Sequence, residues 1–136
     1  MTYWRLHYHL VFSTLNRLPT LTPEREKLFY TILYRKAKEL EVIIHAVGNV
    51  EDHVHLVLSI PPKLSVADCV RHLKGASAHA INLMPGNTEK FAWQRGYGAL
   101  SIGDRSLTTV MEYAAKQKER HRENRVLAVY ERDDEE

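Results

Sequence analysis

The stretch that decides the fold is residues 51–60, Glu-Asp-His-Val-His-Leu-Val-Leu-Ser-Ile. Side chains alternate between the two faces of a strand, so the even positions 54–60 form an apolar face that we expect in the core. His53 and His55 share the other face. Residues two apart lie about 7 Å from each other along a strand, so both rings can offer a neutral nitrogen to one divalent cation. A metal site needs a third ligand, and without one the pair is typical of half-buried, hydrogen-bonded strand histidines.

The composition indicates one globular domain with a basic body. The chain has 136 residues, of which 44% are hydrophobic, enough for one core and too few for two. Five acids and one arginine fill residues 131–136, so residues 1–130 carry a net charge of +6, although the whole chain carries only +2. We expect residues 1–130 to form the domain and residues 131–136 to be a solvated acidic tail without a function. The basic body is compatible with a phosphate-bearing partner.

No membrane or export signal is visible in the sequence. Its longest apolar runs fall well short of the roughly 20 residues that cross a bilayer, and its first residues lack the organisation of a signal peptide. We therefore expect a cytoplasmic protein without a membrane partner. The single cysteine, Cys69, excludes an internal disulfide and lies on the apolar face of an expected helix, so we expect it in the core.

Hydrophobic periodicity predicts the order strand, helix, strand, strand, helix, strand, helix. Thr22, Ser65 and Ser106 are expected to cap the three helices. The strands are expected at 3–13, 42–49 and 53–60 with a broken strand within 91–102, and the helices at 22–40, from 65 toward a turn at 85–87, and at 106–122. This order is typical of a ferredoxin-like α+β fold, an antiparallel sheet with helices, extended by one C-terminal helix.

The last predicted helix places a phenol beside a carboxamide. Tyr113, Gln117, Arg120 and His121 recur on one face, away from the apolar stripe of that helix. Gln117 can offer its side-chain oxygen to a metal, and Tyr113 can attack a phosphate whose charge that metal neutralises. The alternative is a tyrosine that packs and a glutamine that is solvated, and the helix alone does not decide between the two.

Several short motifs follow one another in a specific order and spacing. They are Tyr8-His9-Leu10-Val11-Phe12, His53-Val54-His55, Arg71-His72-Leu73-Lys74-Gly75, Trp93-Gln94-Arg95-Gly96-Tyr97-Gly98 and Tyr113-x-x-x-Gln117. In this set the chain resembles the small single-tyrosine transposases of the HUH superfamily, the enzymes of minimal insertion sequences, which include the REP-associated tyrosine transposases. HUH denotes His-hydrophobic-His. The resemblance extends from about residue 3 to residue 125.

The resemblance implies cleavage and rejoining of single-stranded DNA. In this family a tyrosine attacks a backbone phosphate, which leaves a 5′-phosphotyrosine link and a free 3′-hydroxyl and consumes no nucleotide cofactor. Two histidines and a glutamine hold Mg²⁺ or Mn²⁺. Carried over residue by residue, the resemblance makes Tyr113 the nucleophile and His53, His55 and Gln117 the metal ligands. It also implies a homodimer that acts on hairpin-bearing DNA, with the cis or trans placement of the tyrosine helix left open.

Basic and aromatic side chains are candidates for contact with that DNA. Tyr97 or Trp93 can stack on an unpaired base, and six basic residues can bind phosphates, namely Arg71, Lys74, Arg95, Arg105, Lys116 and Arg120. We expect Arg71 and Lys74 to face outward from their helix. Any single one of these basic residues is more often surface charge without a role. His7 and His9 share a face of the first strand, and we expect them to be structural or to lie near DNA.

Two other functions stay open. The chain is compatible with a DNA-binding protein that descends from such a transposase and no longer cuts, or with a structural or metal-binding module in which the histidines serve packing. A histidine-triad nucleotide hydrolase is excluded, because the third histidine that it needs on the strand is replaced by Val57.

Overall fold

The computed structural model describes residues 2–122 and 128–133, and its centre is one four-stranded antiparallel sheet in the order β2-β3-β1-β4. The strands are β1 (His7–Ser13), β2 (Ile43–Val50), β3 (His53–Ser59) and β4 (Gly98–Ile102). The helices are α1 (Pro23–Glu39), α2 (Val66–Asn82), α3 (Leu107–Ala115), α4 (Gln117–Arg122) and α5 (Ala128–Glu131), with 3-10 turns at Leu15–Arg17 and Asp104–Ser106. This is the predicted ferredoxin-like α+β fold.

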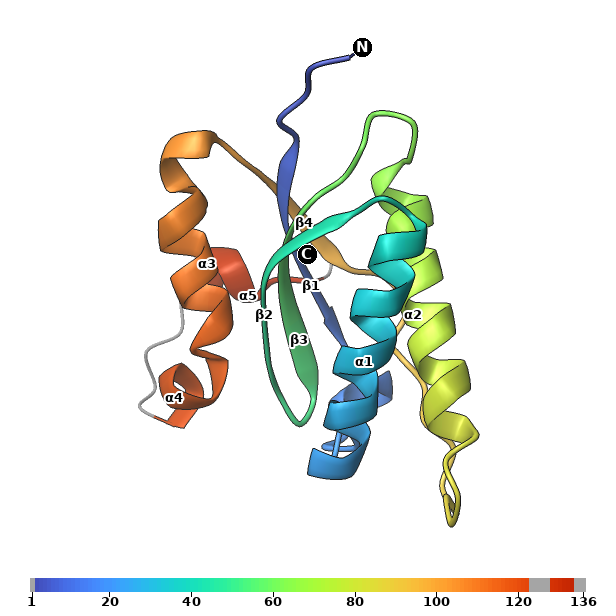
Figure 1. The fold of residues 1–136 in the computed structure, drawn as a ribbon. Helices are drawn as coiled ribbons and strands as arrows, with labels where there is room; N and C mark the ends of the chain where they lie inside the picture. Colours follow the sequence, from blue (N-terminus) through green and yellow to red (C-terminus); the bar gives the residue numbers. More distant parts are fainter. Residues whose placement is uncertain (1, 123–127, 134–136) are drawn as a thin grey trace.

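The helices form a layer on each side of the sheet. Helices α1 and α2 cover one face, and α3 and α4 lie on the other face (Figure 1). The short helix α5 returns beside β1 on the α3 side, so the C-terminal segment lies close to the centre of the sheet (Figure 1). Among the described helices, none is long and apolar enough to cross a membrane.

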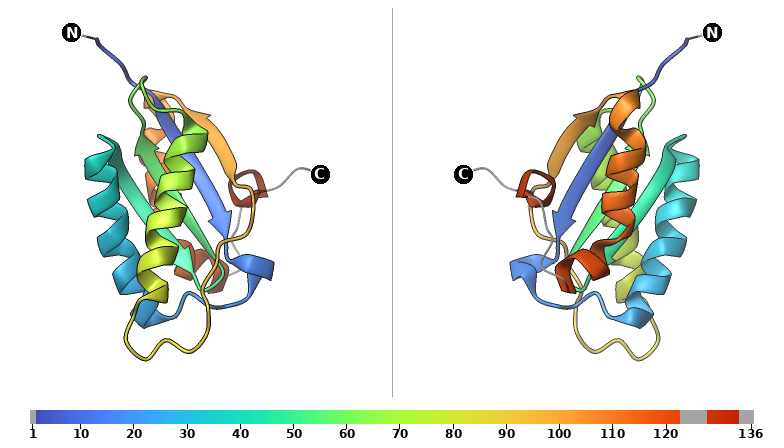
Figure 2. Two further views of the ribbon diagram at one scale, coloured as in Figure 1. Left: turned by 90° about the vertical axis from the view of Figure 1, so that its right-hand side faces the viewer. Right: turned by 90° about the vertical axis from the view of Figure 1, so that its left-hand side faces the viewer.

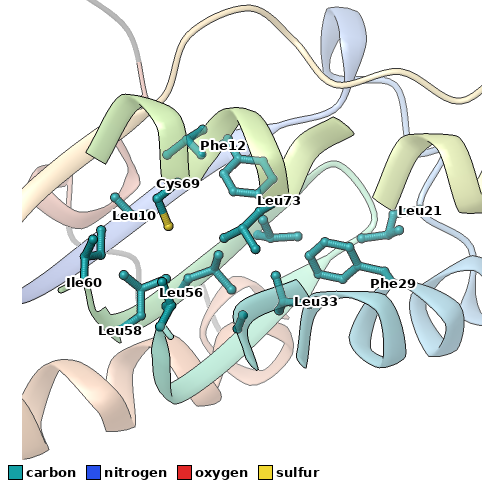
Figure 3. Close-up of a cluster of buried hydrophobic side chains, with 14 of the residues drawn as sticks. Leu10, Phe12, Leu21, Phe29, Leu33, Leu56, Leu58, Ile60, Cys69 and Leu73 are labelled. Atoms are coloured by element: carbon teal, nitrogen blue, oxygen red, sulfur yellow. The ribbon is translucent and has the colours of Figure 1, made fainter. Parts of the chain in front are cut away.

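The apolar core lies between the sheet and the α1–α2 layer (Figure 3). Residues 54, 56, 58 and 60 all belong to it, as the alternation of β3 predicts. Cys69 of α2 is completely buried there, which confirms its predicted place. A second, smaller cluster lies under α3 and contains Val57 and Ala114. Because both faces of the sheet are covered, all seven residues of β3 are buried, including its two histidines.

Two of the three predicted helix caps are formed. The Thr22 side chain accepts a hydrogen bond from the backbone N–H of Arg25, and Ser65 accepts one from that of Asp68 at 3.0 Å. Ser106 makes no such bond, because its backbone is already helical in the 3-10 turn that leads directly into α3. The prediction of a Ser106 cap is therefore wrong.

Three element boundaries differ from the prediction. Strand β1 begins at His7 rather than Tyr3, because its last partner on β3 is Ser59 and Pro61-Pro62 then ends that neighbour. Only residues 98–102 of the expected 91–102 segment form a strand. The last helix is broken at Lys116, whose ψ of 32° separates α3 from α4.

Helix α3 is held against its own sheet by a direct backbone contact. A Cβ added to Gly48 of β2 would overlap the carbonyl oxygen of Ala114, so only glycine allows α3 to lie this close. Figure 2 shows α3 running across the sheet on the side opposite α1 and α2. Lys118 of α4 adds a salt bridge to Glu26 of α1 at 2.8 Å. The helix that carries Tyr113 is thereby fixed over β2 and β3 of the same chain.

Candidate metal and tyrosine site

His53 and His55 project from the same face of β3, and their ring centroids are 5.1 Å apart. Each ring is oriented through its Nδ1 atom: that of His53 lies 2.7 Å from Oδ1 of Asp52, and that of His55 lies 2.9 Å from Nε2 of His9. Contacts of this kind set the tautomer of a metal-binding histidine and leave its other nitrogen free for the metal. Both Nε2 atoms consequently face the α3 side of the sheet.

Two residues from the C-terminal part of the chain meet these nitrogens. Oε1 of Glu131 lies 3.1 Å from Nε2 of each of His53, His55 and His121, and the Nε2 atoms of His53 and His121 are also 3.1 Å apart. The four ligand atoms all lie within 4.8 Å of one another. Atoms bound to one cation at about 2.1 Å stand roughly 3.0 to 3.4 Å apart at right-angle or tetrahedral corners. The cluster therefore has the dimensions of a divalent metal site.

The donor chemistry also fits a divalent cation. Imidazole nitrogens suit transition metals, whereas Mg²⁺ prefers oxygen ligands in octahedral geometry. A set of imidazoles with one carboxylate therefore suits Mn²⁺ better than Mg²⁺.

Tyr113 and Gln117 reach the same cluster from α3 and α4. The Tyr113 hydroxyl donates a hydrogen bond to Oε2 of Glu131. Oε1 of Gln117 lies 3.1 Å from Nε2 of His121, and its amide nitrogen donates to the backbone carbonyl of Tyr113 at 2.9 Å. The guanidinium of Arg120 stands over the Tyr113 ring, 4.5 Å from its centroid. A single chain thus brings its tyrosine and glutamine to its own histidine pair.

Electrostatics keep the carboxylate ionised and shift the pKa values of the two imidazoles in opposite directions. Burial raises the pKa of Glu131, but its hydrogen bonds to His53 and His55 outweigh that effect and hold the pKa far below its usual value. Burial lowers the pKa of His53, yet its bonds to Glu131 and Asp52 raise the pKa above the ordinary value. For His55, burial prevails and the pKa falls. The neutral form of His55 is the form that can bind a metal.

The tyrosine and the glutamine of the site are buried in this structure, whereas His121 is partly exposed. Tyr113 is 2% exposed and Gln117 is fully buried, so the solvated glutamine considered above does not occur. Part of the cover is α5, whose Tyr130 ring lies 4.9 Å from that of Tyr113. A phosphate can reach the tyrosine only if the covering side chains move.

The expected solvation of the acidic C-terminal residues is wrong for two of them. The side chains of Glu131 and Asp133 are only 17% and 14% exposed. The Asp133 carboxylate accepts a hydrogen bond from Ser13 and pairs with Arg17 at 3.5 Å. These contacts hold residues 131–133 against the sheet. Local composition does not reveal such long-range contacts. Residues 134–136 lie outside the described part of the chain.

His121 and Glu131 are the two site residues that sequence reasoning missed. His121 had a usable signal, because it follows Gln117 by one helical turn on the same face as Tyr113. Glu131 had none, since it stands in an acidic run whose usual environment is water. Its role depends on a fold-back of the chain.

The candidate DNA-contact residues fall into separate groups. Lys74 is half-buried rather than facing outward: its ammonium group donates to the carbonyls of Gln94, at 2.8 Å, and Gly96. It therefore braces the loop that carries Arg95 and Tyr97. Arg95 is exposed on that loop, and Tyr97 lines a hollow of about 410 Å³ beside His9 and α5.

The other basic residues lie elsewhere. Arg71 is exposed on α2, where it pairs with Asp68 at 3.3 Å, and α2 covers the sheet face opposite the tyrosine helix. Arg105 is exposed in the turn before α3, and Lys116 is exposed at the α3–α4 break. Only Arg120, over the Tyr113 ring, lies within the site itself.

His7 forms a second polar cluster on the same sheet face. Its Nδ1 lies 2.7 Å from Oγ of Ser59, and its Nε2 lies 2.7 Å from Oδ1 of Asp104, which also pairs with Arg5 at 2.8 Å. These bonds tie β1 to the turn that begins α3. His7 is therefore structural, in agreement with one of the two roles expected for it.

The chain is similar in sequence to known transposases. Residues 2–117 match the family model described as "Transposase IS200 like". The chain is 27% identical to the transposase for insertion sequence element IS200 of Salmonella typhimurium LT2, over 94% of this chain and 87% of that protein. It is 32% identical to the ISDra2 transposase TnpA of Deinococcus radiodurans, over 86% of this chain and 87% of that protein.

Two solved structures share the fold. One is a crystal structure of a protein assigned as a transposase from Deinococcus radiodurans R1, with a TM-score of 0.68 and 25% identity over 92% of this chain and 95% of the other. The second is a REP-associated tyrosine transposase bound to a REP hairpin, with a TM-score of 0.68 and 15% identity over 93% and 76% of the two chains. The matched family segment contains both histidines of β3, Tyr113 and Gln117, and the chain belongs to the IS200-like transposase family.

Proposed function

We propose that this transposase cleaves and rejoins single-stranded DNA through a covalent link between Tyr113 and the 5′-phosphate. Transposases of this family are DNA-cleaving enzymes. The observation that carries the proposal is the meeting of the Tyr113 hydroxyl, through Glu131, with the Nε2 atoms of His53 and His55. It places a nucleophile next to ligands that can hold a divalent cation.

The proposed chemistry is a transfer of one phosphodiester bond. The bond between Oη of Tyr113 and the phosphorus forms while the bond from phosphorus to the 3′-oxygen breaks. The phenol loses its proton and the leaving 3′-oxygen gains one, so the products are a 5′-phosphotyrosine and a 3′-hydroxyl. Attack by a 3′-hydroxyl on the link reverses the step and rejoins DNA without a nucleotide cofactor.

His53, His55 and Gln117 are the proposed protein ligands of Mg²⁺ or Mn²⁺. When bound, the cation would neutralise the charge that develops on the phosphate. Asp52 and His9 hold the two imidazoles in position for it. The donor set favours Mn²⁺ as the first ion to test.

The proposed partner is hairpin-bearing single-stranded DNA. Support comes from the REP-associated relative, which is bound to a REP hairpin, and from the net positive charge of residues 1–130. Arg95, Tyr97 and Lys116 are accessible candidates for its recognition, with Arg71 and Arg105 on more distant surfaces. Lys74 and Arg120 act from within the fold, through the 94–96 loop and the Tyr113 ring.

The homodimer implied by the resemblance stays a prediction. Within the single chain, Tyr113 and Gln117 lie beside the histidine cluster, which supports a cis arrangement of the tyrosine helix as part of this proposal. Light scattering at micromolar protein concentration measures the oligomeric state, and a monomer there would show the dimer prediction to be wrong.

A covalent-capture assay tests the proposed reaction. Labelled single strands that carry hairpins from the DNA flanking the gene are mixed with protein and Mn²⁺ or Mg²⁺, and adducts are separated on a denaturing gel. Wild type and the control Tyr34→Phe, at an exposed position on α1, should yield an adduct, whereas Tyr113→Phe should yield none but still bind the strand. An adduct with Tyr113→Phe would refute the assignment. Binding by wild type without any adduct would favour a non-cutting DNA-binding protein.

A further inference from the structure

Glu131 lies at the centre of the site, although it stands beyond Gln117, the last residue that the family model matches. Its Oε1 lies 3.1 Å from the Nε2 atoms of His53 and His55, and its Oε2 accepts the hydrogen bond of the Tyr113 hydroxyl. We propose that Glu131 is a ligand of the divalent cation through Oε1 and holds the tyrosine hydroxyl through Oε2. This inference rests on the proposed metal-dependent function and adds a ligand from the C-terminal segment.

The donor atoms of the cluster converge closely enough for one cation to take the place of the protons between them. If the Nδ1 atoms of His53 and His55 carry their protons toward Asp52 and His9, both Nε2 atoms present lone pairs. These lone pairs then face an oxygen of Glu131 that is itself an acceptor. Acceptors that converge at 3.1 Å repel one another unless a proton or a cation lies between them, so neutral rings with protons on Nδ1 leave this place to a cation.

The position of Glu131 is built by several independent contacts of its neighbours. The Tyr130 ring packs against Tyr113 and, at 5.3 Å, against His9. The backbone carbonyl of Arg132 lies so close to Gly98 of β4 that a Cβ there would overlap it. Asp133 is bonded to Ser13. The Glu131 carboxylate therefore belongs to a segment, residues 130–133, that packs against the fold and is not an exposed tail.

The contrary model makes opposite predictions for metal affinity. If Glu131 only pairs with protonated histidines, it competes with the cation, and its removal should tighten metal binding. If Glu131 is a ligand, its removal should weaken binding. The sign of the change in Mn²⁺ affinity therefore decides between the two roles.

Calorimetric titration of the full chain with Mn²⁺ at a fixed neutral pH measures whether the Mn²⁺ affinity rises or falls. Glu131→Gln keeps the size of the side chain and an oxygen for the Tyr113 hydroxyl but removes the charge. We expect it to weaken Mn²⁺ binding by about tenfold or more, on the scale at which site residues tune metal affinity. Glu112→Gln, at an exposed position on α3, is the matched control and should bind like wild type. Unchanged or tighter binding by Glu131→Gln would overturn the inference.

A second measurement uses wild type and so does not depend on how the variant folds. Protein labelled with ¹³C at the glutamate carboxyl carbons should show a ¹³C hyperfine coupling to bound Mn²⁺ in pulsed electron paramagnetic resonance. A bound ion without that coupling would overturn the inference.

Failure of the inference can be told apart from failure of the proposed function. If His53→Ala lost Mn²⁺ binding but Glu131→Gln kept the wild-type affinity, the histidine site would be supported and Glu131 would be rejected as a ligand. Absence of Mn²⁺ binding by wild type would reject both the metal site and the role of Glu131. The covalent adduct on Tyr113 is read independently of either result.

Discussion

Nε2 of His9 on β1 lies 2.9 Å from Nδ1 of His55 on β3, and the two rings are stacked with centroids 5.1 Å apart. Burial, together with the neighbouring His55, lowers the pKa of His9 to about 4. His9 is therefore neutral near pH 7 and can accept the Nδ1 proton of His55. That bond leaves the Nε2 lone pair of His55 for the cation, so His9 is a positioning residue for the metal site.

Replacing His9 by phenylalanine should weaken Mn²⁺ binding by about 10- to 100-fold, the usual cost of losing a partner behind a metal ligand. Phenylalanine keeps a ring against His55 but cannot accept its proton. His7→Phe is the matched control, because His7 is also buried on this face of β1 but contacts Ser59 and Asp104. Calorimetry with Mn²⁺ measures both variants, and equal affinities would contradict the role of His9.

Gly48→Ala should displace α3 and destabilise the fold by about 1 to 3 kcal/mol, because the new methyl group would overlap the Ala114 carbonyl. The same displacement should reduce adduct formation at Tyr113. Gly75 is the control, since a Cβ there meets nothing within 4 Å in the middle of α2. Gly75→Ala should raise the free energy of unfolding by about 0.5 to 1 kcal/mol. Urea denaturation measures both changes, and a neutral Gly48→Ala would show that the helix tolerates a shift.

Lys74→Met should destabilise the protein by about 1.5 to 3 kcal/mol, because two loop carbonyls lose a charged donor. Arg71→Met on the exposed side of the same helix should change the free energy of unfolding by no more than about 0.5 kcal/mol. Thermal or urea unfolding compares the two. If Lys74→Met instead kept full stability and weakened DNA binding alone, the original expectation of a phosphate contact would be restored.

Cys69 should resist alkylation in the native protein. Burial raises the pKa of its thiol to about 11, and the residue is completely buried in the core. Because the thiolate is the reactive form, raising the pKa leaves less of it at pH 8, and access is blocked as well. Iodoacetamide at pH 8 should modify the chain rapidly in guanidinium chloride and very slowly without it. Fast modification of the native chain, followed by mass spectrometry, would indicate local opening of α2.

Local periodicity explains why most of the fold was predictable. The alternation of residues 53–60 and the caps at Thr22 and Ser65 depend only on neighbours along the chain, and all three are present. The errors have two causes. Strand β1 begins at His7 because its distant partner β3 ends at Ser59, and Ser106 forms no cap because the adjacent 3-10 turn leads directly into α3.

The candidate site divides in the same way. The shared strand face of His53 and His55, and the spacing of one helical turn between Tyr113 and Gln117, were predictable because they follow from the periods of strand and helix. Three relations required the folded chain: α3 lies over β2 and β3, His9 orients His55, and Glu131 faces the histidines. The His9–His55 contact joins residues 46 positions apart, and the His55–Glu131 contact joins residues 76 positions apart. They arise from packing and chain reversal, which no local pattern of polar and apolar residues encodes.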